Sequence, residues 1–300
     1  MTISCTGSIG LDTTRTPFKT MEKSLGGSGV FFAWSASFFH KTALVGVIGS
    51  DFPPSHKKAL KEKGIELALE EKKGNSFFID WTYGSALTER KTNSIDLGVL
   101  EGYEPKVPDS LKQSQFVYAG TTLPLQQKQF VTQFPDRRFS AIDSIDFYMQ
   151  KNYLPSLLDA LKSFHCLFLN ESEASTLAKT NSLEKAGKII QQKGPETVVI
   201  KKGGEGAILF HKGTIKEFPA YAVKEVVDPS GAGDCFAGGF VGSLAKDGAV
   251  NEETLGKAMA YGAVMGAFCV EDFGLERLKK LNYKDIEKRY RAYNNILKQG

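Results

Sequence analysis

The feature that most constrains the fold is a glycine-rich segment late in the chain, at residues 226–241. Its first part, Asp228-Pro229-Ser230-Gly231, is typical of a tight turn, because proline fixes φ and glycine tolerates positive φ. From Asp234 to about Leu244 the residues are small and apolar with interleaved glycines, which predicts a closely packed helix. The preceding Glu225-Val226-Val227 indicates the end of a β-strand. The segment therefore predicts a strand, a turn and a buried helix.

The residues at the start of this helix indicate an anion site. Gly231-Ala232-Gly233 lies where backbone N–H groups are free and the helix dipole favours negative charge. Their small side chains let an anion reach the backbone. Asp234 follows directly and can accept a proton, and phosphoryl transfer to a hydroxyl requires both groups. The alternative is that Asp234 only caps the helix and the glycines serve packing.

The stretch Asp228-Pro-Ser-Gly-Ala-Gly-Asp234 resembles the Asp-x-x-Gly-Ala-Gly-Asp signature of the ribokinase-like (pfkB) carbohydrate kinases. Ser230 stands where threonine is commoner, and the following Phe236-Ala-Gly-Gly-Phe240 also fits the family. The resemblance implies ATP-dependent transfer of a phosphoryl group to a hydroxyl of a sugar or sugar-containing small molecule. It assigns Gly231, Ala232 and Gly233 to the anion hole, Asp234 to the general base and Asp228 to cofactor binding.

Two N-terminal features fit a substrate site. Asp12 follows the predicted first strand, Thr2–Thr6, and by itself is typical of a loop residue that caps a turn. The resemblance implies instead that Asp12 binds substrate hydroxyls, and that Gly26 and Gly27 of the Leu25–Gly29 loop line the sugar site. Phe31 stands where ribokinases carry asparagine, and a phenyl ring cannot hydrogen-bond a hydroxyl. A ring could stack on it, so a nucleoside is an alternative substrate.

Polar residues at the ends of later predicted strands add cofactor-binding candidates. Asn170 and Glu173 have the spacing of a capping box. The same spacing matches the family motif that holds Mg²⁺ and phosphate through water, and the resemblance assigns the Mg²⁺ to Glu173. Lys201 and Gly203 resemble the family's turn beside the nucleotide phosphates, although a solvated lysine is an equal alternative. Asp143 ends the predicted strand Phe139–Asp143 and is a substrate-binding candidate. The resemblance implies ATP and Mg²⁺ as cofactors and leaves a monovalent cation open.

Helical and strand patterns alternate through most of the chain, which predicts an α/β fold with a mainly parallel central sheet and helices on both faces. Ser76–Thr82 and about 88–95 alternate with no helix between them, which predicts antiparallel strands. The resemblance implies one ribokinase-like domain over residues 1–300. It also implies a small β lid from about 76–97 and parts of 11–25. Lids of this kind either pair two chains as a homodimer or close over one subunit, and the sequence leaves both open.

The composition indicates the cellular compartment and the kinds of partner that this chain can have. The net charge of +4 is mild and the lysines are scattered, which argues against a nucleic-acid partner. Neither a signal pattern nor an apolar run of about 18 residues is present, so we expect a cytoplasmic protein without a membrane partner. The four cysteines are far apart and are expected to be buried thiols, and the four histidines lack the spacing of a metal cage.

Two other classes of function compete with the carbohydrate kinase. A nucleotide-linked oxidoreductase needs a small residue where this chain has Phe236, and its fingerprint belongs to the first βα unit rather than to a late loop. A ligand-binding relic without turnover is disfavoured because Asp234, Asn170 and Glu173 are all present. The sequence contains no P-loop pattern, which argues against P-loop kinases.

Overall fold

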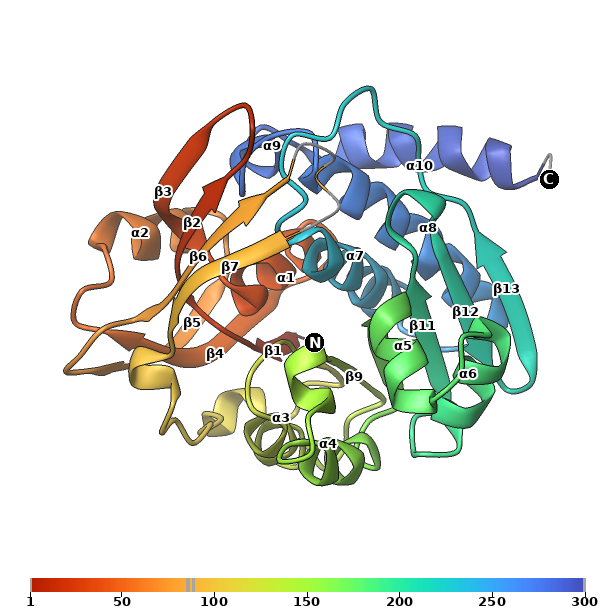
Figure 1. Ribbon diagram of the computed structural model, residues 1–300, viewed down its shortest axis with the longest axis horizontal. Coiled ribbons are helices and arrows are strands. Elements are labelled where there is room, and N and C mark those ends of the chain that lie inside the picture. The colour runs from red at the N-terminus through yellow and green to blue at the C-terminus, as the bar shows by residue number, and fades with distance from the viewer. Residues whose placement is uncertain (1, 85–86, 88–89, 299–300) are drawn as a thin grey trace.

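The computed structural model describes residues 2–84, 87 and 90–298, and a nine-stranded sheet forms its centre (Figure 1). The strands from β11 to β5 are parallel, whereas β12 pairs antiparallel with β11 and with β13. The mainly parallel sheet predicted from the alternating pattern is therefore confirmed. From edge to edge the strands are β13 (Thr214–Phe218), β12 (Ala207–His211), β11 (Thr197–Lys201), β10 (Cys166–Asn170), β9 (Phe139–Asp143), β8 (Phe116–Ala119), β1 (Ile3–Thr6), β4 (Thr42–Gly49) and β5 (Glu66–Lys72).

Both faces of this sheet are covered by helices, and its strands contribute side chains alternately to two hydrophobic cores. In β10, Cys166 and Phe168 belong to one core, and Leu167 and Leu169 to the other. The first core is completed by α1 (Ser28–Ala36), α2 (Pro54–Glu62), α7 (Ala232–Asp247), α8 (Glu252–Cys269), α9 (Glu276–Lys279) and α10 (Tyr283–Leu297). The second is completed by α3 (Pro124–Val131), α4 (Leu154–Leu161), α5 (Glu171–Ala178) and α6 (Leu183–Gln191).

A second sheet of four strands, the small sheet, lies at one side of the molecule (Figure 1). Its order is β3 (Thr20–Gly26), β2 (Gly10–Arg15), β6 (Phe77–Tyr83) and β7 (Arg90–Asp96). The predicted antiparallel pairing of the two later strands is present between β6 and β7, although residues 85, 86, 88 and 89 of this segment lie outside the described residues. Asp12 was expected in a loop, but it lies on β2 because the chain passes from β1 into the small sheet after only a short connection. Its side chain is thereby fixed by strand pairing.

The glycine-rich segment forms a helix as predicted, but no strand precedes it. Residues 225–227 have no strand pairing, and the Val227 N–H donates instead to the carbonyl of Val270. α7 packs closely against two other helices: a Cβ at Gly238 would lie 2.6 Å from the Phe32 carbonyl oxygen in α1, and one at Gly239 would lie 2.7 Å from the Tyr261 carbonyl oxygen in α8. Small residues are therefore required here, and this packing fixes the position of the first turn of α7.

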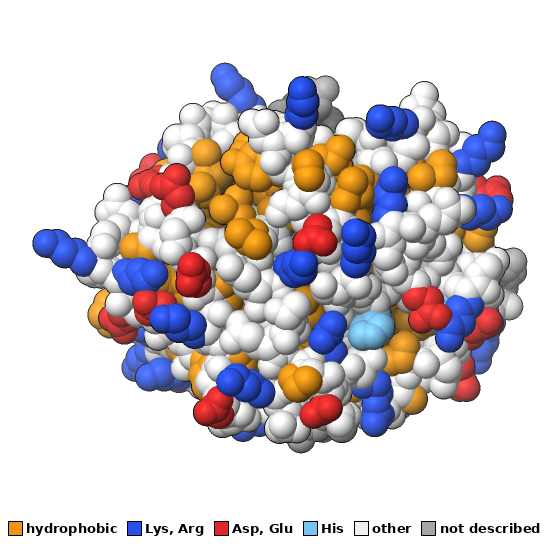
Figure 2. All heavy atoms as spheres, turned by 90° about the horizontal axis from the view of Figure 1, so that it is seen from below, with side chains coloured by type: hydrophobic (Ala, Val, Ile, Leu, Met, Phe, Trp, Pro, Cys, Tyr) orange, Lys and Arg blue, Asp and Glu red, His pale blue; other side chains and the backbone are white. Residues whose placement is uncertain are grey.

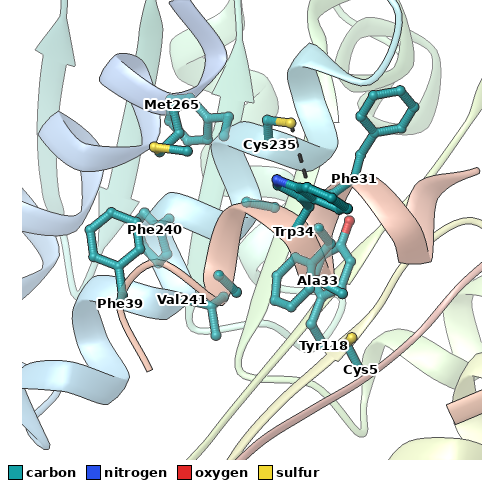
Figure 3. Close-up of a cluster of buried hydrophobic side chains, with 14 of the residues drawn as sticks. Cys5, Phe31, Ala33, Trp34, Phe39, Tyr118, Cys235, Phe240, Val241 and Met265 are labelled. Carbon is teal, nitrogen blue, oxygen red and sulfur yellow. Dashed lines mark hydrogen bonds between the residues drawn. The ribbon is translucent and has the colours of Figure 1, made fainter. Parts of the chain in front are cut away.

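Figure 3 shows side chains of α1, β8 and α7 gathered in one cluster, among them Phe31, Tyr118 and Cys235. All four cysteines are buried and free, as the sequence predicts for thiols in apolar surroundings. On the face drawn in Figure 2, acidic and basic side chains are interspersed and hydrophobic side chains gather among them. Over the described part of the chain, none of the helices combines the length and the hydrophobicity needed to cross a lipid bilayer.

Candidate active site

A cavity of about 560 Å³ opens between the small sheet and the large one. Its walls come from β2, β6 and β7 on one side, from the carboxyl ends of β9, β10 and β11 on the other, and from the starts of α1 and α7. Ligands of open α/β sheets bind outside the carboxyl ends of the strands, where this cavity lies. The site residues predicted from the sequence that line it are Asp12, Gly27, Phe31, Asp143, Asn170, Glu173, Lys201, Gly231, Gly233 and Asp234.

The start of α7 has the geometry of an anion site. Gly231 precedes the helix with φ of 74°, and the Ala232 N–H donates to the Pro229 carbonyl at 3.3 Å. Among the described residues, the N–H groups of Gly233 and Asp234 have no hydrogen-bond acceptor. A Cβ at Gly233 would lie 2.9 Å from Lys201 Nζ, so a side chain there would fill the space beside the ammonium group. Free amides next to a lysine suit a phosphate group.

Asp234 lies in the first turn of α7 and is half-buried at the cavity wall. Burial, followed by the charge of Asp143, raises the pKa of Asp234 to about 7, although Lys201, Tyr118 and Arg90 act in the opposite direction. A carboxylate with a pKa near neutrality is well matched to accept a proton from an alcohol and to release it again.

Asp143 and Lys201 form a mostly buried ion pair beside Asp234. Lys201 Nζ donates to the two carboxylate oxygens of Asp143 at 2.8 and 3.1 Å, and the Ser144 N–H donates to Asp143 Oδ1 at 3.0 Å. The ion pair joins the ends of β9 and β11, so the sheet holds a positive charge close to the amides of α7. Lys201 is therefore a buried partner of Asp143, and the alternative of a solvated lysine is wrong.

Asp12 lines the same cavity, and one of its two carboxylate oxygens has no hydrogen-bond partner among the described residues. Its Oδ2 accepts from the Gly27 N–H at 3.1 Å, whereas its Oδ1 is buried and has no partner within the described residues. A Cβ at Gly26 would lie 2.1 Å from Oδ2, so a glycine is needed for β3 to pass the carboxylate. Burial raises the pKa of Asp12 to about 7, the Gly27 N–H lowers it, and the charges of Asp228 and Asp234 raise it further. An unpaired buried oxygen of this kind suits a ligand hydroxyl.

The remaining wall of the cavity is apolar and aromatic. The ring of Phe31 lies against Gly231, since a Cβ at Gly231 would come within 2.4 Å of its ring carbons. Phe77, Ile79 and Trp81 of β6 face the cavity from the small sheet, and Tyr148 faces it from the opposite side. The guanidinium of Arg90, also on the small sheet, lies 4.8 Å from the Trp81 ring centroid.

Asn170 and Glu173 form the capping box predicted from their spacing. The Glu173 N–H donates to Asn170 Oδ1 at 2.8 Å, and Glu173 Oε2 accepts from the Asn170 N–H at 3.1 Å. The other oxygen, Oε1, accepts from Asn170 Nδ2 at 2.7 Å. Burial, then the charge of Asp143, raises the pKa of Glu173 to about 8. With both oxygens engaged, Glu173 fits a Mg²⁺ held through water better than one bound directly.

Four predicted site residues do not line the cavity: Gly26, Ala232, Gly203 and Asp228. Gly203 begins an exposed 3₁₀ turn, Gly203–Glu205, after β11. Asp228 is buried and accepts from the N–H groups of Ser230 and Gly274 at 2.9 and 3.0 Å. Its carboxylate therefore fastens the turn before α7 to the segment after α8.

Tyr118 is a site residue that sequence reasoning misses. Its side chain is fully buried, and its hydroxyl lies 3.3 Å from Asp234 Oδ1 and 3.4 Å from Asp143 Oδ2. In the sequence it is one aromatic residue within the apolar strand Phe116–Ala119, where a core position is the plain interpretation. The one feature of the sequence that could have indicated this role is the position of Tyr118 near the carboxyl end of a predicted parallel strand, where ligands bind.

A family model described as the pfkB family carbohydrate kinase matches residues 4–280. The chain belongs to the pfkB family of carbohydrate kinases. The resemblance inferred from the glycine-rich turn is thereby confirmed, the chain is a kinase of the ribokinase superfamily, and the oxidoreductase alternative is wrong.

Curated relatives resemble this pfkB kinase over most of its length. A cytidine kinase of Thermococcus kodakarensis is 27% identical over 255 residues, which cover 80% of this chain and 87% of the relative. A nucleoside kinase of Methanothermobacter thermautotrophicus is 26% identical over 281 residues, which cover 88% of this chain and 84% of the relative. A solved structure of a putative ribokinase II from E. coli in complex with ATP and Mg²⁺ superposes with a TM-score of 0.79 and 18% identity. It covers 97% of this chain and 99% of the other. The ribokinase fold predicted from the sequence is thus confirmed.

Proposed function

We propose that this pfkB kinase transfers the γ-phosphoryl group of ATP to a hydroxyl of a sugar or sugar-containing small molecule, with Asp234 as the general base. One observation carries the proposal. A single cavity holds a carboxylate with a free oxygen, Asp12, together with the unpaired N–H group of Gly233 and the carboxylate of Asp234, whose pKa is near neutrality. An acceptor hydroxyl, a phosphoryl group and a proton acceptor can therefore meet there.

In the proposed step, Asp12 accepts a hydrogen bond from one substrate hydroxyl and orients the substrate. Asp234 takes the proton of the reacting hydroxyl as its oxygen forms a bond to the γ-phosphorus. The bond between that phosphorus and the bridging oxygen breaks, and ADP leaves with the electron pair. The N–H groups at Gly233 and Asp234 stabilise the negative charge on the transferring group, and Asp234 later returns its proton to water.

ATP and Mg²⁺ are the proposed cofactors, and a monovalent cation is not supported by any feature described above. The free amides of α7 and the Lys201 ammonium suit the phosphates of ATP. Asn170 and Glu173 would hold Mg²⁺ through water, and the ion would supply neutralisation of charge between the phosphates. Within the described residues, no group of three or more His, Cys, Asp or Glu side chains is arranged so that it could hold a metal ion.

A nucleoside is the second candidate acceptor, and the apolar wall of the cavity favours it. A nucleobase could pack on the aromatic rings of Phe31, Phe77 and Trp81. A free sugar has no such ring and would place its polar hydroxyls against these apolar surfaces. The two curated relatives described above carry the names of nucleoside-type kinases. Asp12 would then bind the ribose hydroxyls.

An ADP-release screen of the purified protein tests the proposal. Pentoses, hexoses, ketoacid sugars and nucleosides are each supplied with ATP and Mg²⁺, and ATP hydrolysis without acceptor is subtracted. We expect acceptor-dependent ADP release and a phosphorylated product visible by mass spectrometry. ADP release that no acceptor increases, together with unmodified acceptors, would contradict the proposed activity.

A further inference from the structure

The buried hydroxyl of Tyr118 lies between the carboxylates of Asp234 and Asp143, two residues that line the cavity. Its Oη is 3.3 Å from Asp234 Oδ1 and 3.4 Å from Asp143 Oδ2. These three residues come from β8, α7 and β9, so the hydroxyl connects the parallel sheet to the first turn of the helix. No step of the proposed reaction above uses it.

The Tyr118 ring is held rigidly in this position. It stacks on the Phe32 ring of α1 with the ring centroids 3.8 Å apart and an interplanar angle of 4°. Its backbone is fixed by parallel pairing with Cys5 of β1 on one side and Ala141 of β9 on the other. The hydroxyl can therefore rotate about its C–O bond but cannot leave the two carboxylates.

The Tyr118 hydroxyl has one proton and lies near two carboxylates that could accept it. The two carboxylates differ in how many other hydrogen-bond donors they have. Asp143 already accepts from the Lys201 ammonium and from the Ser144 N–H. Within the part of the chain that the structure describes, Tyr118 is the donor that reaches the Asp234 carboxylate. An ionised Asp234 therefore has the greater need for the proton of this hydroxyl.

We propose that Tyr118 is a positioning residue for the general base: its hydroxyl donates to ionised Asp234 and keeps that carboxylate ready to accept the substrate proton, then rotates to donate to Asp143 once Asp234 is protonated. The tyrosine keeps its own proton throughout, and only the direction of its O–H bond changes. The inference rests on the proposed function for its catalytic meaning, but the hydrogen bond itself can be tested without turnover.

The charged and titratable groups around Asp234 determine the direction of the effect. They are Asp143 on β9, Lys201 on β11, Arg90 on β7, Asp12 on β2, Tyr118 on β8 and the neighbouring thiol of Cys235. Burial and Asp143 favour the protonated carboxyl, whereas Lys201, Tyr118 and Arg90 favour the carboxylate. Loss of the Tyr118 hydroxyl therefore raises the pKa of Asp234.

The test is a Tyr118→Phe variant, which keeps the ring stacked on Phe32 and removes only the hydroxyl. Carbon-13 NMR of aspartate-labelled protein follows the Asp234 carboxyl through pH, and an Asp234→Asn sample assigns its signal. We expect the midpoint to rise by about one pH unit in Tyr118→Phe, as for the loss of one long hydrogen bond to a charged acceptor. A matched Tyr148→Phe variant removes the hydroxyl of another buried tyrosine, which lines the cavity and, among the described residues, donates to neither carboxylate. It should leave the Asp234 midpoint unchanged.

A second measurement uses the unmutated protein. In a tyrosine-labelled sample, the ζ-carbon shift of Tyr118 should change with the same midpoint as the Asp234 carboxyl, because the hydroxyl changes its acceptor at that pH. An Asp234 midpoint that is equal in Tyr118→Phe and in the unmutated protein would overturn the proposal. A Tyr118 shift that does not follow Asp234 would also overturn it.

Kinetics separate this inference from the proposed function. If Asp234 is the base, the acid limb of the plot of kcat against pH should shift to higher pH by the same one unit in Tyr118→Phe. On that limb kcat should fall about fivefold to tenfold, while the KM for ATP is unchanged. A shifted NMR midpoint without a shifted kinetic limb would contradict Asp234 as base and leave the hydrogen bond established. An unshifted midpoint would contradict the role of Tyr118 and leave Asp234 as base unaffected.

Discussion

Phe31 and Gly231 are in direct contact, although one belongs to the first helix and the other to the turn before α7. A Cβ at Gly231 would lie 2.4 Å from two carbon atoms of the Phe31 ring, and Gly231 has φ of 74°. The contact joins the N-terminal glycine loop to the predicted anion site, so the two glycine-rich segments of the sequence form one wall of the cavity.

Gly231→Ala should therefore lower the free energy of unfolding for two reasons. The positive φ costs about 1–2 kcal/mol for any L-residue, and the overlap with Phe31 adds roughly 1–3 kcal/mol of overpacking. Gly248→Ala is the matched control, since Gly248 has φ of 66° and no atom within 4 Å of its Cβ position. Urea unfolding should show the larger loss of unfolding free energy for Gly231→Ala, and equal losses would contradict the contact.

Lys201→Met should destabilise the fold and Asp143→Asn should partly rescue it. The single change leaves the Asp143 carboxylate mostly buried without its cation, which costs roughly 3 kcal/mol of unfolding free energy. In the double variant that charge is gone, so the combined loss should be smaller than the sum of the two single losses. Denaturant unfolding of all four proteins measures the coupling. Additive losses would mean that the ion pair at 2.8 Å contributes nothing in solution.

Asp12→Asn should weaken binding of the acceptor but not of ATP. One carboxylate oxygen of Asp12 is held by the Gly27 N–H and the other is free for a hydroxyl. Loss of a hydrogen bond to a charged acceptor corresponds to about a 10- to 100-fold rise in the KM for the acceptor. Steady-state kinetics with each substrate varied in turn separate the two effects. An equal rise in both KM values would place Asp12 outside acceptor binding.

Asp234→Asn should make the protein more stable at pH 8. The pKa of Asp234 is raised from 3.8 to about 7 in the folded chain, so between these values the folded state binds more protons than the unfolded one. Stability of the unmutated protein must then fall as pH rises from about 4 to about 7, and the variant escapes this loss. We expect a gain on the order of 2 kcal/mol at pH 8 that shrinks towards pH 4.

Thermal and urea unfolding at several pH values check this gain. Asp159→Asn is the control, because Lys128 lowers the pKa of that exposed carboxyl and its loss should give no gain at pH 8. A variant that is less stable than the unmutated protein at pH 8, or a gain that is independent of pH, would contradict the burial of Asp234.

The parts of the fold that were predictable from sequence are those encoded by local pattern. The strand Phe139–Asp143 and the helix after the glycine-rich turn are both present as predicted, because each is encoded by a local pattern of apolar residues. β5 was missed because this edge strand ends in three consecutive charged residues, Glu70, Glu71 and Lys72, which do not form a strand pattern. Val226 and Val227 suggested a strand, but they pair with no strand among the residues that the structure describes.

The residues of the candidate site also fall into those that a local sequence pattern predicts and those that depend on the tertiary fold. The glycine turn, Asp234 and the Asn170–Glu173 box follow from local helix chemistry and could be found from spacing alone. The positions of Tyr118 and Phe31 against residues far along the chain depend on which strands become neighbours, and no local pattern contains that information. The local sequence predicts a loop at Asp12, whereas Asp12 lies on β2, because the short connection after β1 does not resemble a strand boundary.

The most direct test of the account is the turnover number of Asp234→Asn, measured with the best acceptor from the screen, beside its affinity for ATP measured by calorimetry. We predict that kcat falls by about 10²- to 10⁴-fold, as for the loss of a general base, while the Kd for ATP changes less than about threefold. A kcat within tenfold of the unmutated protein, with ATP still bound, would contradict Asp234 as the base.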